Sequence, residues 1–159
     1  MDEAARKRVL RLFTYGLYAL TAREGDAVSA MTVNWVTQVS FTPSLIAVSL
    51  EQGSHTGAMA RRTGQFALCI YAEGQRELAG LLGRHRANVP DKFADVAWEP
   101  GTATGCPILA GTLGAIECRI VSGTDAGDSV LVVAEIIAAH AFADGTPLTM
   151  AAAGWKHAG

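Results

Sequence analysis

The 159-residue sequence lacks the features that mark several large classes of protein. Its formal net charge is −2, from 13 basic and 15 acidic side chains, so it offers no basic surface for nucleic acid. No apolar run approaches the ~18–20 residues that a membrane span requires. The N-terminus has no continuous apolar stretch of the kind found in signal peptides. We therefore expect a cytoplasmic protein that binds neither nucleic acid nor a membrane.

Cysteine is scarce and several common motifs are absent. Cys69, Cys106 and Cys118 form no CxxC pair, so neither a zinc site nor a disulfide framework is predicted. Cys69 and Cys118 lie in apolar runs, where we expect reduced, buried thiols. The patterns GxGxxG, GxxxxGK[ST] and HExxH do not occur, and the four histidines never share a helical face at metal-ligand spacing. These absences disfavour the common nucleotide cradles and metal enzymes.

What is present indicates one compact domain rich in strands. Half of the residues are hydrophobic and 18% are charged, which is typical of a globular chain of one domain, here residues 1–159. Residues 3–14 predict a short amphipathic helix with Val9, Leu12 and Phe13 as its apolar stripe. Two more short helices are expected at 55–64 and 75–86, and an irregular segment at 88–106. Strands are expected at 17–22, 27–41, 44–50, 65–72, 111–125 and 129–142. Six strands with few helices favour an all-β fold, a closed antiparallel Greek-key barrel.

Two segments carry residues suited to binding chemistry. In residues 29–40, small polar side chains such as Thr32, Asn34 and Gln38 interrupt an otherwise apolar strand. They would suit a flat heterocycle with carbonyl groups at its edge, but an edge strand with one wet face explains them equally well. Ser54 precedes the helix at 55–64, where it would cap the free N–H groups. The same helix end could instead hold a phosphate.

Several motifs, taken in order, resemble the flavin reductase-like, FMN-binding split-barrel family. Residues 32–45, TVNWVTQVSFTPSL, resemble its first signature, and Ser54-x-Thr56 resembles its phosphate-binding turn. Residues 64–70, Gln75, the Asp91-Lys92-Phe93 element and the segment 147–154 are similar to its later motifs. The resemblance runs from about residue 12 to the C-terminus. It implies a six-stranded antiparallel split barrel, a homodimer, and FMN as cofactor, with FAD as the other possibility.

The resemblance also implies roles for individual residues. Met31, Thr32 and Asn34 would line the flavin, Thr37 and Gln38 would meet the polar edge of its ring, and Ser54 and Thr56 would hold its phosphate. Phe93 and Trp155 would cover the ring, unless they belong to the core. The full set of expected flavin-contacting residues is Ser29, Met31, Thr32, Asn34, Trp35, Thr37, Gln38, Leu50, Glu51, Ser54, Thr56, Phe93 and Trp155.

The implied function is an NAD(P)H-dependent flavin reductase, with a monooxygenase or an electron-transfer protein as partner. No side chain is expected to act as acid, base or nucleophile, because the cofactor carries the chemistry. Ser129 follows Gly127-Asp128, where many reductases of this family have a histidine beside the nicotinamide, and His157 stands where an aromatic is common. One alternative is therefore an electron-transfer flavoprotein that does not use a nicotinamide. Another is a barrel for haem, ligated by His55, His140 or His157.

Overall fold

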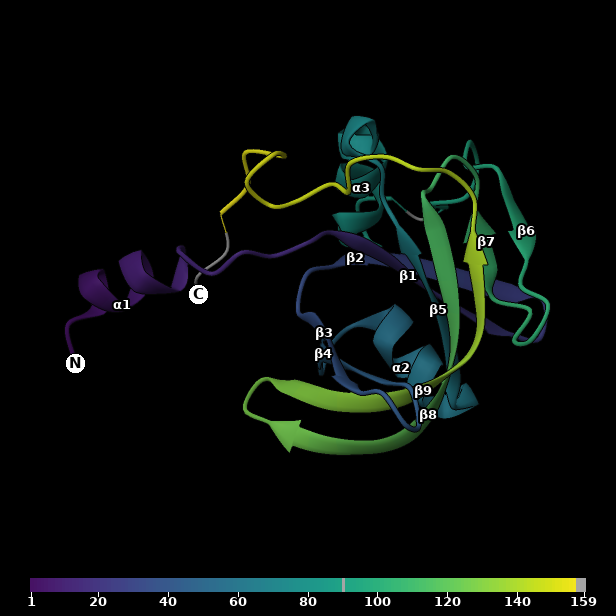
Figure 1. The fold of residues 1–159 in the computed structure, drawn as a ribbon, viewed down its shortest axis with the longest axis horizontal. Coiled ribbons are helices and arrows are strands. Elements are labelled where there is room, and N and C mark those ends of the chain that lie inside the picture. Colours follow the sequence, from purple (N-terminus) through teal and green to yellow (C-terminus); the bar gives the residue numbers. More distant parts are fainter. Residues whose placement is uncertain (90, 157–159) are drawn as a thin grey trace.

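Antiparallel β-structure dominates the computed structural model, which describes residues 1–89 and 91–156 (Figure 1). The helices are α1 (Glu3–Leu10), α2 (His55–Thr63) and α3 (Arg76–Gly83), and a 3₁₀ turn (Glu73–Gln75) precedes α3. The strands are β1 (Tyr18–Glu24), β2 (Ala27–Val33), β3 (Val36–Ser40), β4 (Leu45–Glu51), β5 (Gln65–Ile70), β6 (Trp98–Pro100), β7 (Pro107–Leu109), β8 (Gly114–Ala126) and β9 (Ser129–Ala141). In the described ranges, no helix has the length and apolar character needed to cross a membrane.

The main sheet has seven strands in the order β2-β1-β5-β8-β9-β4-β3, so β2 and β3 form its edges. The predicted count of six strands was wrong, because the run 27–41 divides at Asn34-Trp35. Before this point the chain pairs with β1, and after it with β4. A second sheet, β6–β7, lies partly within the segment 88–106, which was predicted to be irregular. A hairpin turn at Gly127-Asp128 joins β8 to β9, with Gly127 at φ 70°.

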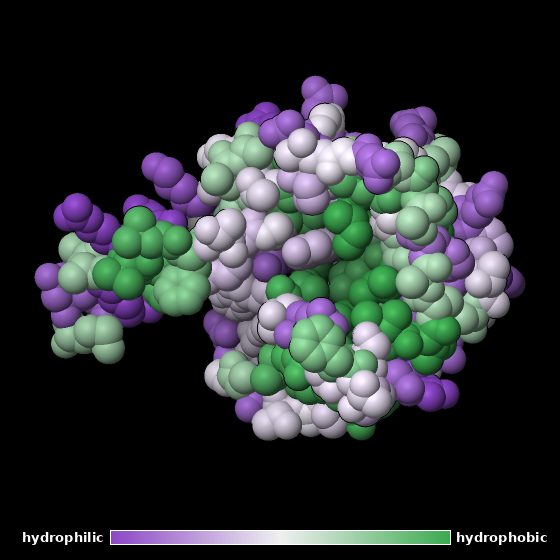
Figure 2. All heavy atoms as spheres, viewed as in Figure 1, coloured by the Kyte–Doolittle hydropathy of each residue, from purple (hydrophilic) through white to green (hydrophobic). Residues whose placement is uncertain are grey.

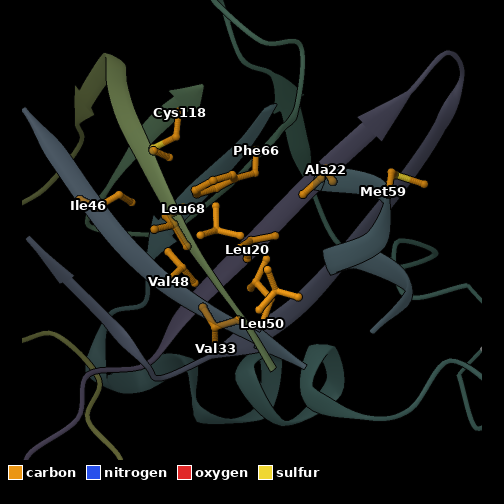
Figure 3. Close-up of a cluster of buried hydrophobic side chains, with 14 residues drawn as sticks. Leu20, Ala22, Val33, Ile46, Val48, Leu50, Met59, Phe66, Leu68 and Cys118 are labelled. Atoms are coloured by element: carbon orange, nitrogen blue, oxygen red, sulfur yellow. The ribbon is translucent and has the colours of Figure 1, made fainter. Parts of the chain in front are cut away.

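The two faces of the sheet bury separate apolar clusters, because successive side chains of a strand point to opposite sides. Leu20 and Phe66 point into the cluster on the face covered by α2, to which Met59 also belongs (Figure 3). Cys69 and Tyr71 point to the opposite face, which α3 covers. All three cysteines are buried and unbridged, as expected for Cys69 and Cys118. The sheet curls around α2 and leaves α3 outside (Figure 1).

The N-terminal helix lies apart from this core. Asp2 caps α1, which ends at Leu10 and projects from the rest of the molecule (Figure 1). None of its residues is buried, and Val9, Leu12 and Phe13 are 56%, 77% and 59% exposed. The predicted helix is present but ends at Leu10 and not at residue 14, so Leu12 and Phe13 lie beyond it, and the predicted apolar stripe stays exposed in the described chain. Figure 2 shows the apolar surface that results on this projection.

Candidate functional site

A cavity of about 880 Å³ lies at the β2 edge of the main sheet. Its walls come from β2, the end of β4, the first turn of α2 and the segment from Leu82 to Phe93. Ten of the thirteen expected residues line it: Ser29, Met31, Thr32, Asn34, Trp35, Leu50, Glu51, Ser54, Thr56 and Phe93. The structure thus brings together residues that are up to 64 positions apart in the sequence (29 to 93). We take this cavity, called the β2 pocket below, as the candidate site.

The first turn of α2 presents hydroxyl groups and backbone donors to the β2 pocket. Ser54 is the N-cap, as predicted: its Oγ accepts a hydrogen bond from the Gly57 N–H at 3.1 Å and donates to Met31 Sδ at 2.9 Å. Thr56 is buried, and its Oγ1 lies 2.8 Å from Ser29 Oγ. A helix N-terminus carries a partial positive charge and N–H groups without helical partners. This wall of the pocket is therefore suited to an anion.

Thr32 connects β2 to α3. Its hydroxyl donates to the Ala79 carbonyl at 2.7 Å, and it accepts from the Tyr71 hydroxyl at 2.9 Å, since a carbonyl can only accept. Burial raises the pKa of Tyr71, so this phenol keeps its proton. The hydroxyl of Thr32 therefore already uses its one hydrogen in the bond to the Ala79 carbonyl. Its role at the pocket is to fix the position of β2.

Asn34 lines the pocket and carries a buried polar atom that no described residue satisfies. Its side-chain Nδ2 is buried without a hydrogen-bond partner, and no other side-chain nitrogen or oxygen in residues 1–89 and 91–156 shares that condition. An unsatisfied buried donor costs about 1–3 kcal/mol, so such atoms are rare in folded proteins. Asn34 thus carries, at the wall of the pocket, a donor whose acceptor the described residues do not supply.

Basic side chains from the α3–β6 connection form another wall of the pocket. Arg84, His85, Arg86 and Lys92 line it together with His55, the first residue of α2. Lys92 Nζ donates to the carbonyls of Ala30 and Leu82, at 3.2 and 2.6 Å. Burial lowers the pKa of Lys92. These cations were not among the expected site residues: Arg84 and Arg86 fell in the helix expected at 75–86, which ends at Gly83, and Lys92 was noted only within the Asp91-Lys92-Phe93 element.

Three expected residues lie away from the β2 pocket. Thr37 and Gln38 are exposed on the edge strand β3, where their side chains bond to nearby backbone carbonyls. Trp155 packs over Gly80 of α3, with the Arg76 guanidinium 6.0 Å from its ring. None of the three lines the pocket formed by this chain.

A second polar cluster, called the Glu117 cluster, lies outside the pocket. Glu117 is fully buried on β8, and its carboxylate accepts hydrogen bonds from Thr102, Ala103, Thr104 and His140, the last at 2.9 Å. Burial opposes its ionisation, but hydrogen bonds from His140, Thr104 and Ala103 outweigh that effect and lower the pKa of the carboxyl to about 2. The cluster fixes the loop between β6 and β7.

The geometry does not favour the haem alternative. His140 is bonded to Glu117, and His55 is within 2.8 Å of Arg86. His157, the third candidate ligand, lies outside the described residues. No group of three or more histidine, cysteine or acidic side chains in the described part of the chain could hold a metal ion.

The two most informative sequence relatives are flavoproteins by description. The chain is 33% identical over 143 residues to an FMN reductase (NADH), SmoA, of Agrobacterium fabrum, covering 89% of this chain and 78% of that protein. It is 32% identical over 124 residues to a diflavin flavoprotein A 3 of Nostoc sp., covering 77% of this chain. The match spans only 21% of the length of that larger protein.

The fold and the family agree with these relatives. A solved structure of BorF, the flavin reductase component of a bacterial two-component tryptophan halogenase, superposes with a TM-score of 0.82 at 29% identity, covering 94% of this chain and 92% of that one. A family model described as "Flavin reductase like domain" matches residues 10–158. The chain therefore belongs to the flavin reductase-like domain family.

Proposed function

We propose that the protein is an oxidoreductase that uses NADH to reduce flavin, and that the flavin, FMN or FAD, binds in the β2 pocket. The observation that carries the proposal is the buried, unpaired Asn34 amide at the β2 edge in a chain of this family. A flavin ring carries carbonyl and ring-nitrogen acceptors, so the residues present fit this group. The relative SmoA is described as an FMN reductase using NADH, and its similarity supports the same substrates here.

The chain's own residues bind and orient the cofactor in this proposal. Asn34 donates to the polar edge of the ring, and Ser54 and Thr56 hold the phosphate at the start of α2. Phe93 and Trp35 line the same pocket and exclude water from the ring. When bound, flavin supplies the redox chemistry by accepting a hydride from the nicotinamide. Hydride transfer to the flavin requires no acid or base from the chain, because the cofactor carries the chemistry.

We further propose a homodimeric split barrel as the working form. The main sheet ends in β3, an edge strand with exposed Val39 that is followed by exposed Phe41, and exposed Leu12 and Phe13 follow α1. Unpaired sheet edges and apolar patches of this kind mark association surfaces. A second chain covering them could bring Thr37 and Gln38 to a pocket. Sedimentation-velocity analysis tests this: a dimer supports it and a monomer at micromolar concentration contradicts it.

The remaining proposals concern partner and compartment. BorF is described as the flavin reductase component of a two-component tryptophan halogenase, and a relative from Rhodococcus opacus as the reductase component of a 4-nitrophenol monooxygenase, which supports a monooxygenase-type partner for this chain. Three buried, unbridged cysteines are consistent with a reducing compartment, the cytoplasm.

Steady-state NADH oxidation with added FMN tests the reductase activity. We expect a rate that depends on both NADH and FMN. A flavin that binds but is reduced by dithionite and not by NADH would favour the electron-transfer alternative, for which Ser129 in the β8–β9 turn is the motivating residue. The buried side chain of Ser129 bonds to Asp128 and does not line the β2 pocket.

A further inference from the structure

A second cavity, called the β6–β9 cavity, lies between the small sheet and the end of β9, on the side of the molecule away from α1 (Figure 1). Its volume is about 420 Å³, within the range of small-molecule sites, about 300–1,000 Å³. Trp98 of β6, Ile108 of β7 and His140 of β9 are among the residues that line it. It shares no lining residue with the β2 pocket, so the proposed flavin chemistry leaves it without a role.

One wall of the β6–β9 cavity is a histidine whose ring is held from behind. Burial opposes the ionisation of Glu117, but the hydrogen bonds that it accepts lower its pKa to about 2, so it is a carboxylate. Since a carboxylate can only accept, His140 Nε2 carries a hydrogen and donates it to Glu117 at 2.9 Å. No described residue bonds to the other ring nitrogen, Nδ1. A carboxylate behind one nitrogen fixes the ring, which is how proteins orient the second nitrogen toward a ligand.

Aromatic side chains lie beside this histidine. The Phe142 ring stacks on the His140 ring, with centroids 6.1 Å apart and planes 12° apart, and Trp98 lines the same cavity. Phe142 is nevertheless 52% exposed. Aromatic rings favour a further ring in stacked or edge-to-face contact. The β6–β9 cavity is therefore suited to a flat aromatic ligand that would cover Phe142.

The charges around the β6–β9 cavity disfavour an anion. No lysine or arginine of the described chain lines it, whereas the acidic side chain of Glu99 does, and the Glu117 carboxylate lies behind His140. A phosphate or carboxylate here would face negative charge without a cation to compensate it. A phenolic hydroxyl is neutral and both donates and accepts, so it can bond to His140 Nδ1 in either protonation state of the ring.

From this arrangement we propose that the β6–β9 cavity binds a neutral phenol, whose ring packs against Phe142 and Trp98 and whose hydroxyl bonds to His140 Nδ1. Glu117 is a positioning residue for this site, because it holds His140 and does not contact the ligand. The proposal is independent of the proposed function, since the two cavities have no lining residue in common.

The test follows amide proton–nitrogen spectra of the protein during titration with phenol, toluene and benzoate, with excess FMN present to fill the β2 pocket. Phenol should bind with a dissociation constant of about 1 mM or below, a modest value for a ligand of this size. Toluene lacks the hydroxyl and benzoate carries a charge, so both should bind at least about fivefold more weakly. The amides that shift should lie in 97–111 and 140–142, and the Nδ1 resonance of His140 should shift with phenol alone.

A matched pair of variants tests the aromatic wall. F142A removes the exposed ring beside His140 and should weaken phenol binding about fivefold, the value of one aromatic contact. F13A removes a similarly exposed ring, 59% against 52%, beyond the end of α1, and should bind phenol as the wild type does. Both rings are more than half exposed, so neither substitution should unfold the protein.

Four results would overturn the proposal. Phenol might show no saturable binding up to about 10 mM. Equal affinities for phenol and toluene would remove the bond to His140, and equal affinities of F142A and wild type would remove the contact with Phe142. Amide shifts confined to 28–35 and 49–56 would place phenol in the β2 pocket instead. The titration contains no nicotinamide and measures no turnover, so a failure of the proposed reductase activity would not alter its outcome.

Discussion

The Glu117 cluster and the β2 pocket are both polar, but only the first is complete. In the cluster, every group around the buried carboxylate points a donor at it, and its negative charge faces His140. In the pocket, a buried amide nitrogen of Asn34 has no partner, and Arg86 has no acid. Buried polar groups that are satisfied by the chain stabilise the fold, whereas those left open indicate a ligand.

Whether a buried polar group has a partner within the chain therefore distinguishes structural polar residues from candidate ligand-binding ones, whatever their residue type. A buried carboxylate beside a histidine resembles a catalytic pair, yet the geometry of Glu117 assigns it to the β6–β7 loop. Asn34, between the edge strands β2 and β3, resembles an ordinary surface residue, yet its amide nitrogen is buried and unpaired at the wall of the candidate site. Substitutions in the Glu117 cluster should consequently lower the free energy of unfolding. Substitutions of the unpaired polar group in the pocket should leave that free energy unchanged or raise it, and should weaken flavin binding.

The largest expected effect is on the fold, from E117Q. The substitution keeps the size of the side chain but removes its charge and points an NH₂ group at donors from Ala103, Thr104 and His140. Breaking a buried pair in this way should lower the free energy of unfolding by about 3–5 kcal/mol. Denaturant unfolding measures it. A loss below about 1 kcal/mol would show that the cluster is not the structural element described here.

Acid should weaken the same cluster in the wild type. The pKa of Glu117 is lowered from 4.5 to about 2, so its contribution is fully present above pH 4.5 and is lost as the pH falls through about 2. The shift corresponds to about 3 kcal/mol. The free energy of unfolding, measured between pH 6 and about pH 2, should fall more steeply in wild type than in E117Q. Parallel curves for the two proteins would contradict the assignment.

A third effect comes from the glycine that accommodates the carboxylate. A Cβ on Gly101 would collide with the Glu117 carboxylate, whereas a Cβ on Gly74 would meet nothing within 4 Å. G101A should therefore destabilise the protein by about 1–3 kcal/mol, the usual cost of overpacking a buried site, and G74A serves as the matched control. Thermal unfolding of both variants decides the point; equal melting temperatures would mean that the loop relaxes freely.

The smallest effect should appear in the pocket, and with the opposite sign on stability. N34A removes the unpaired amide, so the ligand-free protein should unfold at the same or a slightly higher denaturant concentration. Its affinity for FMN should fall about tenfold, the value of one lost hydrogen bond in a buried site. Titration with FMN and denaturant unfolding, run on one preparation, give both numbers. Reduced stability with unchanged FMN affinity would place Asn34 among the structural residues.

Local signals in the sequence predicted much of this arrangement. Ser54 and Gly64 were readable as helix ends, because capping and a left-handed φ of 72° depend on single residues. The division of the strand at Asn34-Trp35 could not be predicted, since both halves contain β-branched residues typical of strands and only pairing separates them. The family resemblance implied that Trp155 covers the flavin ring or belongs to the core, and in the structure it packs on α3. Arg86 and Lys92 reach the site through tertiary folding of an irregular connection, which leaves no periodic pattern.

The central claim is that the β2 pocket holds a flavin that NADH reduces. The most direct test is the absorbance spectrum of the purified protein with FMN from about 300 to 600 nm, the region of flavin bands, repeated anaerobically after NADH is added. The account predicts perturbed flavin bands that bleach on mixing, and bands that N34A restores to those of free FMN at the same concentrations. Flavin bands identical to free FMN in the wild type, with no bleaching by NADH, would contradict it.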